Sequence, residues 1–305
     1  MISRLRPEAT LGSAVEFSGV GVHSGQISNM KVIPSQERSG IVFKRTDIKG
    51  KDPFIKLSPE SVVDPTLCTR IVNKNGISVA TIEHLLAAFR ISSITNALVE
   101  IDSPEVPIMD GSAIEFVSAF KRSGIVHQEA LVPSIVITKP IDVSSKNGKI
   151  SILPSSDCEI SVKLDYERIN PVIGENNSYS FSFEDDLSDV ARARTFGWIA
   201  DYEKVVALGL AKGTSEANTI VILEDNSIKN ADGLRNPKEL VMHKCLDLIG
   251  DISFAGFDII GKIECINPSH ALNNLLMKKL IHEINSHELI TQETSVQFER
   301  ILNFA

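Results

Sequence analysis

Several features that would assign the sequence to a membrane or secreted class are missing. Its 305 residues include one tryptophan and three tyrosines, and no apolar run approaches the ~18 residues that a membrane span needs. Residues 1–14 carry basic side chains without the apolar core of a signal peptide. The four cysteines lie far apart and form no CxxC pair, which favours reduced thiols packed in a core. We therefore expect a cytoplasmic protein without a transmembrane segment.

Charge and composition are those of an ordinary folded protein. Hydrophobic residues make up 43% of the chain and charged residues 23%, a balance typical of globular proteins and not of disordered ones. The formal net charge of −8 argues against nucleic acid as the main partner. The length allows one large domain or two of ordinary size.

Segments with the patterns of strands and helices follow the same broad order twice. Each half contains several short strands and two helices, without the regular alternation of a doubly wound parallel sheet, and this predicts an α+β fold. Within the second half, one helical segment is expected over 189–207. We expect a first domain over residues 1–126, a linker over 127–134 and a second domain over 135–305. No residue-level repeat relates the two halves.

One helix is marked at both ends by residues with capping preferences. Asn236 suits the N-cap position and Glu239 can complete a capping box, while Gly250 suits a left-handed stop. Inside this helix, His243 and Asp247 are four positions apart and therefore lie one above the other on the same face. An imidazole stacked over a carboxylate is a candidate half of a metal site.

A second helix can supply the other half of that site. Thr81 is placed to cap it, and Glu83 and His84 follow in its first turn. Together His84, His243 and Asp247 would provide three protein ligands with an open fourth position, the usual form of a catalytic zinc site. Fe(II) and Co(II) suit the same donors. Adjacent residues on a helix point about 100° apart, so Glu83 would lie beside the metal as a proton acceptor and not as a ligand.

Further residues are candidates for the chemistry on weaker grounds. His270 begins the C-terminal helix, where a carboxylate such as Asp251 is needed to keep an imidazole charged against the helix dipole. Thr195 has a hydroxyl that can donate to a developing oxyanion. Spacing alone also allows simpler interpretations: a capping histidine, an ordinary threonine, and a local ion pair between His243 and Asp247.

Six short motifs occur in the order found in one enzyme family. They are residues 81–85 (TIEHL), 109–113 (MDGSA), 193–197 (ARTFG), 232–235 (DGLR), 243–251 (HKCLDLIGD) and 261–274 (GKIECINPSHALNN). Each motif alone is weak. The six together span nearly the whole chain and closely resemble UDP-3-O-acyl-N-acetylglucosamine deacetylase, the zinc enzyme of lipid A synthesis in Gram-negative bacteria. The resemblance implies two domains of similar architecture, each a small mostly antiparallel sheet packed on two helices, with the active site between them.

The resemblance also implies a role for each matching side chain. The implied zinc ligands are His84, His243 and Asp247. The implied catalytic residues are Glu83 as the general base, His270 as the general acid, Asp251 as its orienting partner and Thr195 beside the oxyanion. Two residues are implied to contact substrate, Lys244 and Phe196.

The implied reaction is hydrolysis of the N-acetyl group of UDP-3-O-(3-hydroxyacyl)-N-acetylglucosamine, giving acetate and the free amine. The implied partner is this UDP-linked acylated amino sugar, met by a monomeric enzyme at or near the inner membrane surface. Two other functions remain open: a metal-dependent hydrolase with another substrate, and a non-catalytic nucleotide-sugar binding protein. Glu83 favours an enzyme, because binding alone does not need it.

Overall fold

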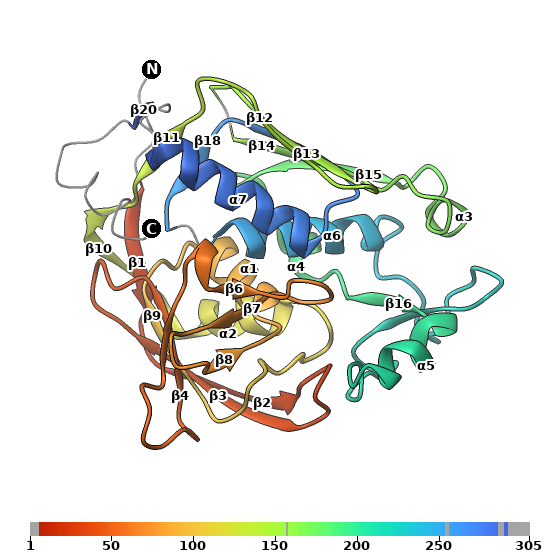
Figure 1. Cartoon of the computed structure of the whole chain (residues 1–305), viewed down its shortest axis with the longest axis horizontal. Helices are drawn as coiled ribbons and strands as arrows, with labels where there is room; N and C mark the ends of the chain where they lie inside the picture. The colour runs from red at the N-terminus through yellow and green to blue at the C-terminus, as the bar shows by residue number, and fades with distance from the viewer. Residues whose placement is uncertain (1–5, 157, 254–255, 286–289, 292–305) are drawn as a thin grey trace.

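Two five-stranded sheets form the outer layers of the protein, and helices fill the space between them (Figure 1). The computed structural model describes residues 6–156, 158–253, 256–285 and 290–291. The α+β fold expected from the sequence is confirmed, because each half of the chain contributes one mostly antiparallel sheet.

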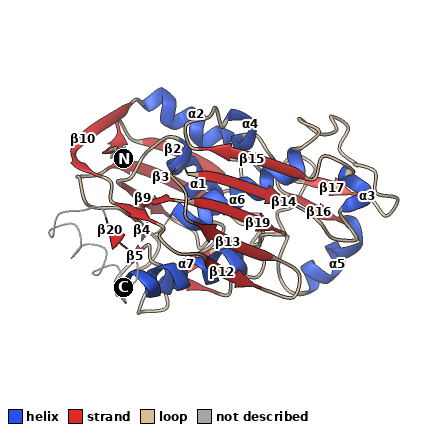
Figure 2. Cartoon of the chain, turned by 90° about the horizontal axis from the view of Figure 1, so that it is seen from above, coloured by secondary structure: helices blue, strands red, loops and turns tan. Residues whose placement is uncertain are grey.

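The two sheets share one topology. Across the first sheet the strands are β2 (Val15–Val20), β3 (Ile27–Pro34), β9 (Ala97–Ile101), β4 (Ile41–Arg45) and β5 (Phe54–Lys56). Across the second, which Figure 2 shows from above, they are β12 (Ile141–Ser144), β13 (Lys149–Leu153), β19 (Lys262–Ile266), β14 (Glu159–Lys163) and β15 (Ser178–Ser182). In each sheet the central strand is the last in the chain, and it forms the single parallel pair. The halves therefore repeat in topology without repeating in sequence.

Two helices from each half form the middle layer. They are α1 (Glu83–Ile91), α2 (Ile114–Ser123), α6 (Glu239–Ser253) and α7 (His270–Asn285). Helices α1 and α6 pack against each other, and nearly all of their residues are buried. A helix that is buried all round belongs to the centre of a core. Polar residues on α1 and α6 are therefore brought together in the interior.

Shorter elements connect these layers. Two of the small sheets are strand pairs: β1 (Pro7–Leu11) with β10 (Ile125–Leu131), and β16 (Phe196–Trp198) with β17 (Ile220–Ile222). In a third, β7 (Arg70–Val72) lies between β6 (Val62–Val63) and β8 (Ser78–Val79). In the fourth, β11 (Ser134–Val136) lies between β18 (Asp258–Ile260) and β20 (Ile290–Thr291). The short helices are η1 (Pro59–Ser61), α3 (Asn170–Ile173), α4 (Ser188–Ala191) and α5 (Ile199–Ala207). Most of the expected linker thus lies in strand β10. Within the described part of the chain, every helix is too short or too polar to span a membrane.

Gly250 does not end its helix, and the predicted stop at this residue is wrong. Helix α6 continues to Ser253. A Cβ atom at Gly250 would lie 2.1 Å from the carbonyl oxygen of Glu83, far inside the contact distance that a real Cβ atom allows. The glycine is needed because it lets α6 approach α1 closely, and not because it turns the chain.

Replacing Gly250 with alanine is expected to destabilise the protein, because the added methyl group forces α1 and α6 apart. Overpacking of this kind typically lowers the free energy of unfolding by about 1–3 kcal/mol. Urea unfolding of Gly250→Ala measures the loss. Gly197→Ala is the control, since nothing lies within 4 Å of a Cβ at Gly197. Equal stability of the two variants would contradict the packing argument.

The N-cap contact expected of Asn236 is present, because its side-chain oxygen accepts the Lys238 N–H at 2.9 Å, but the expected capping box with Glu239 and the expected cap at Thr81 are wrong. The Glu239 carboxylate accepts hydrogen bonds from the Arg235 N–H and from Arg194, so it does not close a capping box with Asn236. Thr81 has a φ of 57° and donates its hydroxyl to Glu105 at 2.9 Å, and no side chain caps α1. At Thr81 and at Glu239, distant partners take the side chain that the local pattern assigned to a cap.

Residues 193–197 are not helical, although the sequence pattern predicted one helix over 189–207. Helix α4 ends at Ala191, and the chain runs extended into β16 before α5 begins. The Thr195 N–H donates to the Gly111 carbonyl at 2.8 Å, and β16 pairs with β17. These distant partners hold the segment extended, and a local pattern does not reveal them.

Candidate metal centre and active site

Three buried side chains from the two central helices converge on one point. His84 comes from α1, and His243 and Asp247 lie one turn apart on α6. Asp247 Oδ1 is 3.5 Å from His84 Nε2 and 3.4 Å from His243 Nε2. None of the three residues is more than 4% exposed. Among the described residues, this is the one cluster of His, Cys, Asp and Glu side chains with metal-binding spacing.

The separations fit a tetrahedral metal ion. Zinc bonds of ~2.0–2.2 Å place tetrahedral donor atoms about 3.4 Å apart, and the two measured separations match this value. A hydrogen bond from His243 Nδ1 to the Ala193 carbonyl, at 3.1 Å, leaves Nε2 as the donor atom that faces the cluster. His84 Nδ1 has no hydrogen-bond partner within the described part of the chain. The donor set therefore fits a divalent metal with three protein ligands.

The protonation states suit metal binding. Burial lowers the pKa of His243 to about 3, so its imidazole is neutral, as a ligand must be. Burial alone would raise the pKa of Asp247, but electrostatic attraction to the neighbouring His243 and Lys244 side chains holds this pKa well below its usual value. Lys244 Nζ donates to Asp247 Oδ2 at 2.8 Å, while Oδ1 is the oxygen nearest the histidines.

Glu83 lies beside the triad with its carboxyl group buried. Its Oε2 accepts the Thr69 N–H at 3.0 Å, and its Oε1 is 3.8 Å from His270 Nε2. Burial raises the pKa of Glu83, although the charges of His270 and His84 oppose the rise. A carboxyl group of raised pKa, next to the triad but outside its donor set, has the properties of a general base.

His270 forms a buried ion pair with Asp251. The His270 Nδ1 atom is 2.8 Å from Asp251 Oδ2. Burial would lower the pKa of His270, but the charges of Asp251 and Glu83 outweigh burial and raise this pKa to about 10. The imidazole is therefore protonated at neutral pH, with Nδ1 bound to Asp251 and Nε2 directed toward Glu83. Such a group can donate a proton into the site.

Two residues of this cluster were not predicted from the sequence, Thr69 and Asn273. Thr69 donates its backbone N–H to Glu83 and its hydroxyl to Asp251, at 3.0 and 2.5 Å. Asn273 donates its side-chain amide to Asp251 at 2.8 Å. Asn273 follows His270 by three positions on one helix, a spacing that could have indicated it. The local pattern around Thr69 carries no such signal.

A pocket of about 550 Å³ opens over the triad and is lined by residues from both halves. Every site residue predicted from the sequence lines it except Asp251, which contacts His270. Thr195 and Phe196 reach the pocket because their segment is extended. Lys244 Nζ lies 5.4 Å from the centre of the Phe196 ring. The structure thus brings all of these predicted residues to one place.

The two α+β halves meet at a buried His₂Asp triad, and a carboxyl group and an imidazolium lie beside it. This arrangement is that of a metal-dependent hydrolase. The comparison with known families is specific. The chain belongs to the UDP-3-O-acyl N-acetylglycosamine deacetylase family, whose model matches residues 8–282.

The similarity to individual members extends over nearly the full length of both chains. A protein from Myxococcus xanthus is 39% identical over 284 residues, which cover 93% of this chain and 89% of its own. One from Nitratiruptor is 37% identical over 291 residues, or 95% of each chain. One from Campylobacter fetus is 36% identical over 299 residues, which cover 98% of this chain and 99% of its own. All three are named UDP-3-O-acyl-N-acetylglucosamine deacetylase.

Proposed function

We propose that the protein hydrolyses the N-acetyl group of UDP-3-O-(3-hydroxyacyl)-N-acetylglucosamine, the committed step of lipid A biosynthesis. The products are acetate and the free amine. The observation that carries the proposal is the position of the metal-binding triad beside a buried Glu83 and a charged His270, at the base of one pocket. Relatives of nearly equal length that bear the deacetylase name support this substrate.

Zinc is the metal that we propose for His84, His243 and Asp247. Two imidazole nitrogens and one carboxylate oxygen suit zinc in a catalytic site, and Fe(II) suits the same donors. The bound metal would supply a Lewis acid that polarises the amide carbonyl and lowers the pKa of water toward ~7.

The protein's own groups then move two protons. Glu83 accepts a proton from water as the water oxygen bonds to the acetyl carbon. His270 gives its Nε2 proton to the sugar nitrogen as the carbon–nitrogen bond breaks, so that the amine leaves as a neutral group. Asp251 orients His270 and keeps it charged. The Thr195 hydroxyl, which lines the same pocket, donates to the oxygen that gains negative charge.

The remainder of the pocket suits the rest of the substrate. The Phe196 ring offers a face on which the sugar or diphosphate part can stack, and the nearby Lys244 ammonium offers a positive charge. Leu67 and Val205 contribute apolar surface to the pocket, which suits an acyl chain.

The organisation of the protein follows the same proposal. Residues 1–126 and 135–305 would be two domains joined by 127–134, and the separate five-stranded sheets within these ranges support the division. We propose a monomeric enzyme in the cytoplasm, which meets its amphiphilic substrate at the inner membrane. The four free cysteines fit a reducing compartment.

The direct test is acetate release from the UDP-linked acyl sugar by zinc-loaded protein. We expect one acetate for each amine formed. A hydrolase with another substrate would bind zinc and release no acetate, and a non-catalytic binding protein would bind the sugar nucleotide without turnover. Either result would overturn the proposal.

Substituting Asp251 with asparagine is expected to move the basic limb of the kcat/KM profile to lower pH. Burial lowers the pKa of His270, and the Asp251 charge is the largest of the opposing interactions that raise it to about 10. Without that charge, His270 loses its proton at lower pH, and the acid form is the active one. The shift is expected to be about one pH unit or more.

The control for this pH shift is Asn273→Ala. It removes a neutral hydrogen bond to the same Asp251 oxygen but leaves the carboxylate charge in place. Its basic limb should therefore move much less. A basic limb that stays fixed in Asp251→Asn would mean that His270 is not the proton donor.

A further inference from the structure

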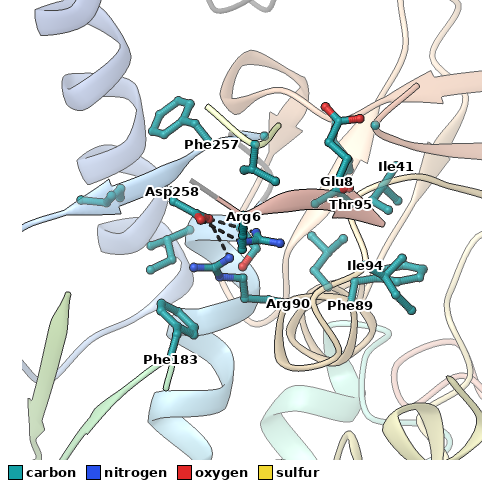
Figure 3. Close-up of a pocket in the computed structure, with 18 of the residues that line it drawn as sticks. Arg6, Glu8, Ile41, Phe89, Arg90, Ile94, Thr95, Phe183, Phe257 and Asp258 are labelled. Carbon is teal, nitrogen blue, oxygen red and sulfur yellow. Dashed lines mark hydrogen bonds and ion pairs between the residues drawn. The ribbon is translucent and has the colours of Figure 1, made fainter. Parts of the chain in front are cut away.

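A second cavity lies toward the C-terminal ends of the two central helices (Figure 3). Its volume is about 480 Å³, within the size range of small-molecule binding sites. It shares no lining residue with the catalytic pocket. The C-terminal turns of α1 and α6 both reach it, through Phe89 and Ile252, while the metal ligands lie earlier on the same helices.

Most of the cavity wall is apolar and comes from both halves of the chain. Leu86, Phe89 and Ile94 line it from the first half, and Phe257 and Ile263 from the second. All five are buried, between 0% and 8% exposed. Such a surface favours an aliphatic chain over a sugar or a nucleotide, because it offers few partners for hydroxyl groups.

Positive charge exceeds negative charge in the polar part of the wall. Asp258 accepts two hydrogen bonds from Arg6, at 2.8 and 3.0 Å, and one from Arg90, at 2.7 Å, so two guanidinium groups share one carboxylate (Figure 3). The bond from Arg90 uses Nη1, which leaves donors on that group for a second acceptor. Arg38 and Lys56 also line the cavity, and within the described part of the chain neither side chain forms an ion pair.

The remaining acid of the wall does not balance this charge. Glu8 Oε2 accepts hydrogen bonds from the Arg38 backbone N–H and from the Asn96 side chain, at 2.7 and 2.8 Å. The lining contains four cationic side chains and two acidic ones, Glu8 and Asp258, so its net charge is positive. An anionic group is therefore the complementary partner.

We propose that this cavity binds a single-chain amphiphile with a carboxylate head, that is, a free fatty acid of medium length. The carboxylate would accept hydrogen bonds from guanidinium nitrogens that Asp258 does not use, chiefly Nε and Nη2 of Arg90, with the positive charge of Arg6 beside it. The chain would lie against Phe89, Ile94 and Phe257. The volume suits one acyl chain and is too small for a two-chain phospholipid. The proposal does not depend on the reaction assigned to the other pocket.

The test is equilibrium dialysis of zinc-loaded protein with radiolabelled dodecanoate, under conditions that separate the two pockets. Val205→Trp, on the wall of the catalytic pocket, obstructs acyl chains there, so any dodecanoate that this variant binds lies elsewhere. This variant should still bind one dodecanoate per chain. Adding Ile41→Trp, which fills the second cavity from strand β4, should abolish that binding. The circular dichroism and urea unfolding of Ile41→Trp alone should match those of the unsubstituted protein, which shows that the variant folds.

Head group and chain length test the chemistry in the Val205→Trp background. Dodecanol should bind at least about tenfold more weakly than dodecanoate, because it cannot pair with a guanidinium group. From octanoate to dodecanoate, each methylene should tighten binding about fourfold. Arg6→Gln and the milder Arg38→Gln should weaken dodecanoate binding and leave dodecanol binding unchanged. Absence of binding to Val205→Trp, binding that survives Ile41→Trp, or equal affinity for dodecanol would each overturn the proposal.

Discussion

A Glu83→Gln enzyme is expected to turn over at least about 10²-fold more slowly than the unsubstituted protein and to keep its metal. Glutamine preserves the shape of Glu83 and can still accept the Thr69 N–H, but it cannot take a proton from water. The carboxyl group lies beside the triad and is not among its three donors. Steady-state turnover and metal content, measured on the same preparation, check both parts of the expectation.

Glu105→Gln is the matched control for this substitution. Glu105 is also buried, and its carboxylate accepts hydrogen bonds from the backbone N–H groups of His23 and Ser24. It does not line the catalytic pocket, so turnover should stay within a few-fold of the unsubstituted enzyme. If Glu83→Gln turned over at the unsubstituted rate, Glu83 would not be the general base. If this variant lost its metal, Glu83 would be a metal ligand.

An Asp247→Asn protein is expected to bind zinc at least about 100-fold more weakly and to lose activity in proportion. Outer partners of a metal ligand typically account for about 10–100-fold in affinity, and a direct ligand should account for more. Asparagine is preferable to alanine, because its oxygen still accepts from Lys244 Nζ. Alanine would leave that half-buried ammonium without its partner and would destabilise the fold as well. The measurement is the metal retained after dialysis against graded chelator.

Asp251→Asn controls for the loss of a buried negative charge on the same helix. Asp251 follows Asp247 by one turn and contacts His270, Thr69 and Asn273. It is not in the donor triad, so this variant should retain its metal while its pH profile changes. Full metal retention by Asp247→Asn would contradict the assignment of Asp247 as a metal ligand. Denaturant unfolding of the metal-free proteins separates metal loss from loss of fold.

The residues of the site could be predicted because local spacing along the helices and the order of the short motifs both indicate them. His243 and Asp247 share a helix face, and this follows from 3.6 residues per turn in any fold. Glu83 and His84 are neighbours on a helix, so their different directions also follow from local geometry. The six ordered motifs then joined these local fragments to one family, which the match over residues 8–282 confirms.

The errors fall where long-range contacts outweigh local preference. Gly250 has the signature of a helix end, but it lies inside the helix, where the backbone of Glu83 passes too close for a larger residue. Residues 193–197 have a helical pattern, but strand pairing and the contact between Thr195 and Gly111 hold them extended. That difference matters for the site, because the extended segment carries Thr195 and Phe196 into the pocket.

By itself, the sequence determined the α+β class, the members of the triad, and the His243–Asp247 half of the metal centre. The tertiary structure decided how His84 meets that half, since α1 and α6 converge only when Gly250 lets them pack. It also decided the shared topology of the two sheets, the part played by Thr69 and the existence of a second cavity. The physical reason is range: helical periodicity acts over a few residues, whereas these features depend on contacts between residues far apart in the chain.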